Sequence, residues 1–174
     1  MDKDGKNCSG NGKNNNNAFQ LFFDLEIKAG KYYKFLADKF PEDSDFWNRI
    51  SAEEAHHGSL VQSMEEFISE EEFTDLFSLS VNCLSVLMDK FEAVEKELEE
   101  VIWTKKKYYE FAMDIEESAF EVHFQRFMSG DIALLKNKSV LPVIEIFKNL
   151  NRDDKNHYQR IMNLYHKYFP GQTP

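Results

Sequence analysis

The sequence predicts an all-α protein, built as an antiparallel four-helix bundle with one long crossover connection. Four segments place apolar residues at alternating steps of three and four, which is the period of an amphipathic helix. The 174 residues include only seven Gly and four Pro, so long helices are rarely interrupted. A further long segment separates the second helix from the third, and its length allows these two helices to run parallel.

The first helix is expected at residues 19–40. Its apolar seam reads Phe22, Glu26, Ala29, Tyr33, Leu36 and Phe40. Apart from the Tyr33 hydroxyl, Glu26 is the one polar group in the stripe that faces the core. Residues 1–17 are rich in Gly, Asn and Lys and have almost nothing to bury, so we expect a disordered tail ahead of one helical domain at 18–170.

The second helix is expected to start with Ser44 as its N-cap. Its seam reads Trp47, Ile50, Glu54, His57, Val61, Met64 and Ile68, so its only ionisable members are central. The alternative register through Glu53 and His56 gives a much poorer apolar stripe. We therefore expect Glu54 and His57 to face the core and Glu53 to lie on a charged outer face.

The last helix repeats this interruption. It is expected to begin near residue 139, with Pro142 in its first turn, and its seam reads Val143, Phe147, Leu150, Asp154, His157, Ile161, Leu164 and Tyr168. The third helix, at about 104–128, carries Tyr109, Ala112, Glu116, Ala119 and His123 in one stripe. Glu116 is its inward carboxylate. Residues 69–103 form the crossover, which is expected to be partly helical.

Four carboxylates at core positions need compensation, because an isolated buried ion loses several kcal/mol of hydration. Two divalent cations would cancel four carboxylate charges, and neutral imidazoles would complete their coordination. In Glu54-x-x-His57 and Asp154-x-x-His157, a carboxylate and an imidazole share one helical face. At helical rise all six groups can meet at one level of the bundle. The pattern therefore predicts a metal centre.

The strings around these residues resemble the ferritin-like superfamily, in particular its rubrerythrin-related branch, over roughly residues 19–168. They read FFDLEIKAGKYYKFLA, ISAEEAHHGSL, EFAMDIEESAFEVHF and RDDKNHYQRI. The resemblance implies a di-iron centre, with manganese or zinc as alternative metals, whose ligands are Glu26, Glu54, His57, Glu116, Asp154 and His157. It also implies an oxidoreductase, a rubrerythrin-like oxidase or peroxidase that reduces peroxide or dioxygen. A rubredoxin-like Cys-x-x-Cys domain is missing, so the electrons would come from an external donor.

Two further departures from the rubrerythrin pattern concern the site itself. Ala119 stands where rubrerythrins place an additional glutamate, and Asp154 replaces the usual longer glutamate. Tyr33 and His123 follow the first ligands of their helices by two turns, where they could hydrogen-bond carboxylates across the bundle. Ordinary aromatic packing remains open for Tyr33, and a role as a spare ligand or core histidine remains open for His123.

Composition limits the remaining choices. The net charge of −10 argues against binding to a phosphate backbone, so no nucleic-acid partner is expected. Cys8 and Cys83 are too few for a disulfide framework or a thiolate metal site, which fits a reducing cytoplasm. No apolar run is long enough to span a membrane. Iron sequestration and a metal-free helical interaction domain stay open as alternative functions, and the oligomeric state stays open too, a homodimer included.

Overall fold

The computed structural model describes residues 18–124 and 140–174, without the side chains of residues 75–83 and 120–124. All regular secondary structure in this part of the chain is helical, which confirms the predicted all-α class. The predicted tail at 1–17 and the break between the last two predicted helices lie outside the described residues. No helix among those described is long and apolar enough to cross a membrane.

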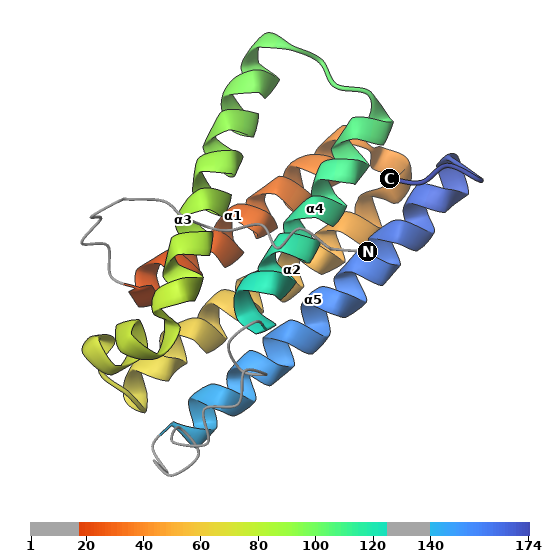
Figure 1. Ribbon diagram of the computed structural model, residues 1–174. Helices are drawn as coiled ribbons and strands as arrows, with labels where there is room; N and C mark the ends of the chain where they lie inside the picture. The colour runs from red at the N-terminus through yellow and green to blue at the C-terminus, as the bar shows by residue number, and fades with distance from the viewer. Residues whose placement is uncertain (1–17, 125–139) are drawn as a thin grey trace, which may run out of the picture.

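The described helices are, in chain order, α1 (Ala18–Lys39), η1 (Pro41–Asp43), α2 (Ser44–Ser63), η2 (Met64–Glu66), α3 (Glu70–Glu100), α4 (Lys105–Phe124) and α5 (Leu141–Tyr168). Figure 1 shows α1, α2, α4 and α5 side by side, while α3 packs against α1 and α4. The close pairs are α1 with α2 and α4 with α5, and each pair is antiparallel. Helices α2 and α4 point the same way, so α3 carries the chain back between them.

The connecting segment forms one helix of 31 residues, α3, where the sequence predicted only partial helix. Ser69 begins it with a capping box: its hydroxyl accepts from the Glu72 N–H, and the Glu72 carboxylate accepts from the Ser69 N–H. At 1.5 Å per residue the helix spans about 46 Å, enough to cross the whole assembly. Its described inward side chains include Phe73, Leu84, Leu87 and Phe91.

The start of α2 differs from the prediction. Ser44 is already the first helical residue, and Asp43 stands at the N-cap position without a side-chain cap bond. Its carboxylate instead accepts hydrogen bonds from Lys105, Tyr109, Lys167 and Tyr168. Partners from α4 and α5 therefore replace the local cap, which the sequence around Ser44 does not reveal.

Two glycines allow α1 and α2 to pack closely. A Cβ at Gly30 would lie 3.3 Å from both the Glu54 Cβ and the Ser51 carbonyl oxygen, and one at Gly58 would lie 3.3 Å from the Phe23 ring. The Ser51 hydroxyl also donates to the Gly30 carbonyl at 2.8 Å. This close approach brings the buried carboxylate of α1 beside that of α2.

Candidate metal centre

Six ionisable side chains lie inside the helix assembly, at the positions that the sequence assigns to the site. They are Glu26 from α1, Glu54 and His57 from α2, Glu116 from α4, and Asp154 and His157 from α5. Each is only 2 or 3% exposed. Apolar residues one or two turns away on the same seams are fully buried, among them Ile50, Val61, Leu150 and Ile161. The amphipathic pattern of each helix thus turns its charged residues inward as well.

The first cluster of ligand atoms joins α1 and α2. Atoms of Glu26, Glu54 and His57 all lie within 4.8 Å of one another. The Nδ1 atom of His57 lies 3.1 Å from Oε2 of Glu54 and 3.6 Å from Oε2 of Glu26. One imidazole nitrogen therefore faces two carboxylates.

The second cluster joins α2, α4 and α5 through Glu54, Glu116 and His157, again within 4.8 Å. The Nδ1 atom of His157 lies 2.8 Å from Oε1 of Glu54 and 3.6 Å from Oε2 of Glu116. Each oxygen of Glu54 thus faces a different histidine, and the two imidazole rings stack at 5.5 Å. Glu54 is the residue that joins the two clusters.

Asp154 does not belong to either cluster. It is buried, and its charge contributes to the raised pKa of Glu116, so it lies close to that carboxylate. The sequence treats Asp154 and Glu54 as equivalent members of two matching motifs. The structure separates them, in keeping with a side chain that is one methylene shorter.

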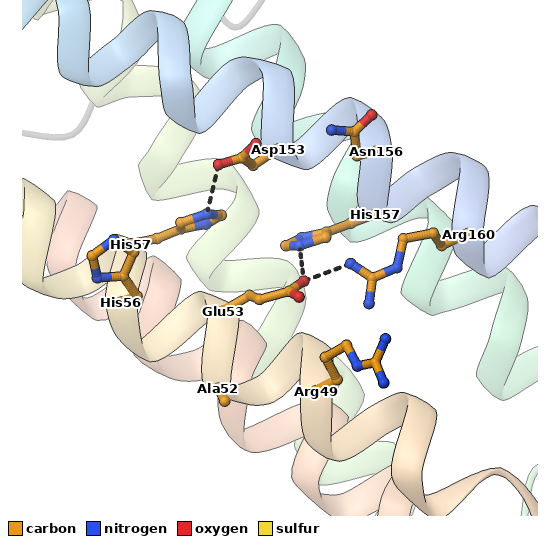
Figure 2. Close-up of a pocket in the computed structure, with 9 residues that line it drawn as sticks. All are labelled: Arg49, Ala52, Glu53, His56, His57, Asp153, Asn156, His157 and Arg160. Carbon is orange, nitrogen blue, oxygen red and sulfur yellow. Dashed lines mark hydrogen bonds and ion pairs between the residues drawn. The ribbon is translucent and has the colours of Figure 1, made fainter.

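The outer nitrogens of the two histidines face carboxylates that sequence reasoning missed (Figure 2). Nε2 of His157 lies 2.8 Å from Glu53, whose same oxygen accepts from Arg160 at 2.6 Å. Nε2 of His57 lies 3.7 Å from Asp153. Carboxylates in this place fix the ring orientation and direct Nδ1 toward the centre.

Glu53 lies off the apolar seam, as expected, but its contact with His157 was not predicted. Its side chain is 37% exposed, yet one of its oxygens contacts a buried histidine of another helix. A signal for this role exists in the sequence, because an acidic residue directly precedes the motif carboxylate in both Glu53-Glu54 and Asp153-Asp154. Each of these acidic residues serves the histidine of the opposite helix.

A pocket of about 520 Å³ opens between α2 and α5 beside the two histidines (Figure 2). Arg49, Glu53, Asp153 and Arg160 line it together with His57 and His157. The two histidines of the centre therefore line a pocket that small molecules can enter.

Tyr33 contacts the centre from α1. Its ring is fully buried and stacks on Trp47 at 5.8 Å, and its hydroxyl donates to Oε1 of Glu116. Burial, followed by the nearby charge of Glu116, raises the pKa of Tyr33 well above its usual value, so the phenol keeps its proton. The side chain of His123 lies outside the described residues. Ala119 is buried on α4.

The pKa values show how the chain balances these charges by itself. Burial lowers the pKa of His57, but Glu26 and Glu54 outweigh it and raise the value to about 11. Burial likewise opposes protonation of His157, and Glu116 and Glu54 raise its pKa to about 12. Burial and the charge of Glu54 raise the pKa of Glu116 to about 7. Protonated His57 and His157, with partial protonation of Glu116, thus offset part of the charge of the four carboxylates.

The same residues fit metal ions. Carboxylate oxygens and imidazole nitrogens are the donors that iron, manganese and zinc accept, and each cluster brings three donors within reach of one ion. Glu54 Oε1 and His157 Nδ1 form an ion pair but lack the geometry of a hydrogen bond. Two ligand atoms turned toward one metal ion would have this arrangement. The arrangement suits two ions joined by Glu54.

Comparison with known proteins identified no relative of this chain. No family model, curated protein or solved structure matches it. The likeness of its motifs to rubrerythrins therefore stays a prediction, and the function must be argued from the site.

Proposed function

We propose that this chain is a four-helix bundle of α1, α2, α4 and α5, with α3 as its crossover, that holds two iron ions in its core. We further propose that it is an oxidoreductase that reduces peroxide or dioxygen with electrons from an external donor. The observation that carries the proposal is the pair of buried Glu/His clusters that share Glu54. A protein core rarely contains four carboxylates unless cations compensate them.

The protein side chains have separate tasks in this proposal. Glu26 and His57 would hold one ion, Glu116 and His157 the other, and Glu54 both. Asp153 and Glu53 keep the imidazoles oriented, and Arg160 holds Glu53 in place. Tyr33 keeps a proton directed at Glu116.

Bound iron would supply reversible one-electron redox chemistry at this point. Small oxidants could approach through the pocket between α2 and α5, since its walls include both histidines. The apolar seams above and below the site exclude other solutes. Peroxide and dioxygen are small enough to enter such a site.

Anaerobic reconstitution with ferrous iron tests the proposal directly. We expect about two ions per wild-type chain, followed by a change in visible absorbance when peroxide or dioxygen is added. Glu54→Ala should reduce binding at both positions, because both clusters use this residue. His56→Ala is the matched control, since His56 neighbours His57 in sequence but is exposed. Only trace iron in the wild type, or equal losses in the two variants, would refute the proposal.

A metal-free helical interaction domain is the second candidate. The observation in its favour is that His57 and His157, once protonated, already pair with the central carboxylates. Under this alternative, replacing Glu26, Glu54 and Glu116 by Leu should leave a folded protein whose stability does not depend on metal. A wild-type melting temperature that rises with iron, and a triple variant in which it does not, would exclude it.

A further inference from the structure

Four oxidisable aromatic side chains form a series of ring contacts between the buried centre and the protein surface. The Tyr33 ring stacks on Trp47 with centroids 5.8 Å apart, Trp47 meets Tyr109 at 5.1 Å, and Tyr109 meets Tyr168 at 6.1 Å. They come from α1, α2, α4 and α5 respectively, so the folded helices create the series and the sequence does not.

The two ends of the series differ in their surroundings. At the inner end, the Tyr33 hydroxyl donates to Glu116 of the centre. Tyr33, Trp47 and Tyr109 are fully buried, whereas Tyr168 is partly exposed near the C-terminal end of α5. An electron donor in solution can therefore contact only the Tyr168 end.

Chemistry distinguishes this route from its neighbours. Tyrosine and tryptophan lose one electron to strong biological oxidants, whereas phenylalanine does not. A second branch leaves Tyr33 through Tyr32, but the further ring contacts of Tyr32 are with Phe35 and Phe111. Among the described side chains, the Trp47 route alone joins the centre to the surface through ring contacts between oxidisable residues.

Proton acceptors are placed where this route needs them. The hydroxyls of Tyr109 and Tyr168 both donate to the Asp43 carboxylate, at 2.7 and 2.9 Å. Burial raises the pKa of Asp43, but hydrogen bonds from Lys105 and its other partners outweigh burial and lower it to about 2. The carboxylate is thus ionised and can accept a phenol proton when the phenol loses an electron. The Trp47 N–H lies near the Tyr109 hydroxyl, without the geometry of an ordinary hydrogen bond.

We propose that Tyr168, Tyr109, Trp47 and Tyr33 conduct single electrons from a donor at the surface to the buried centre. This inference rests on the proposed function, because that function supplies the oxidant.

In each passage an external one-electron reductant would be oxidised at Tyr168, and one electron would reach the buried centre, where bound iron would supply the oxidant. Each tyrosine gives its proton to a carboxylate when it is oxidised and takes it back when it is reduced. Asp43 accepts the proton of Tyr168 or Tyr109, and Glu116 accepts that of Tyr33. Two passages, with two protons from solvent, reduce one peroxide to two waters.

The path can be tested without metal. The full metal-free chain carrying Trp103→Phe retains Trp47 as its only tryptophan. Flash photolysis with a ruthenium tris-bipyridine sensitiser and persulfate oxidises accessible tyrosines, and transient absorption then reports a tryptophan radical. We expect this radical to form after the tyrosyl radical, and to lose most of its amplitude in Tyr109→Phe and in Tyr168→Phe. Unchanged amplitude and rate in both variants would overturn the path.

The iron-loaded chain provides the second test. After peroxide addition, a nitroso spin trap and peptide mass spectrometry should locate a radical on Tyr168. The adduct should disappear in Trp47→Phe and return in Trp47→Tyr, because both changes shrink the indole but only tyrosine can be oxidised. Trp103→Phe, away from the route, should keep the adduct. An unchanged adduct in Trp47→Phe would overturn the path. If the wild type binds no iron, the proposed function fails and flash photolysis alone decides the path.

Discussion

Asp43 and Glu54 are both carboxylates buried among helices, but their surroundings differ in charge. Asp43 has two lysines and two tyrosine hydroxyls around one carboxylate, and these partners lower its pKa to about 2. Glu54 shares its site with three more carboxylates and only two imidazoles.

The chain therefore compensates Asp43 with its own cations, whereas the centre around Glu54 is fully balanced only when protons or metal ions are added. Burial of an acidic residue alone does not distinguish a structural site from a functional one. The shortage of positive partners does.

Removing one carboxylate from each region should produce the largest contrast. In the metal-free protein, Asp43→Ala should cost about 3 kcal/mol of unfolding free energy, at the low end for a broken buried ion pair because Lys167 remains exposed. Glu54→Leu should change stability by less than about 1 kcal/mol, since Glu26 and Glu116 still face the two histidines. Denaturant unfolding measures both, with the exposed Asp45→Ala as control. Equal losses at Asp43 and Glu54 would remove the distinction.

Metal should stabilise one region and leave the other unaffected. Ferrous iron at a hundredfold excess over its dissociation constant should add about 2.7 kcal/mol to wild-type stability. Asp43→Ala should keep this gain, whereas Glu54→Leu should lose it. Thermal melts with and without iron under anaerobic conditions would show the difference, and a gain that survives in Glu54→Leu would place the metal elsewhere.

The stability of the metal-free protein and the stabilising effect of metal should depend on pH in opposite directions. The folded pKa values of His57 and His157, about 11 and 12, lie above the ordinary 6.5, so their contribution to metal-free stability is complete below about pH 6.5 and declines as pH rises. Metal must displace these protons, so its stabilising effect should grow over the same pH range. A metal effect that grows on acidification would contradict this assignment.

Acid should remove the stabilisation that Asp43 provides. This loss should be slightly smaller than the gain in stability expected from metal. The folded pKa of about 2 lies below the ordinary 3.8, so the stabilisation is present above about pH 4 and is lost as pH falls through 2. The difference is worth about 2.4 kcal/mol at 1.36 kcal/mol per pH unit. Asp43→Asn should lack this acid-dependent loss. Parallel unfolding curves for the two proteins between pH 4 and 2 would be evidence against it.

The smallest expected effect concerns the asymmetry within the centre. Asp154 lies outside both Glu/His clusters, so Asp154→Glu should extend a carboxylate toward them and tighten the weaker metal by up to about tenfold, or 1.4 kcal/mol. Metal titration under anaerobic conditions measures this change. Asp45→Glu is the control, because Asp45 is exposed in the first turn of α2. Weaker binding in Asp154→Glu would mean that the helices are already fitted to aspartate.

Local patterns determined much of this protein. The seam through Trp47, Glu54 and His57 and the seam through Phe147, Asp154 and His157 identified which ionisable residues are buried, because helical period and hydrophobicity act within one helix. The start of α5 followed from a similar signal, Pro142 in its first turn.

Only the tertiary structure decided which groups meet across helices. Glu54 faces both histidines while Asp154 lies outside both Glu/His clusters, and Glu53 contacts a histidine of another helix. Asp43 stands at the N-cap position of α2, but its carboxylate accepts hydrogen bonds from partners more than sixty residues later in the chain. These outcomes depend on side-chain length and on which helix faces are adjacent. Periodicity along a single helix carries no information about either, because the same seam can face several neighbours.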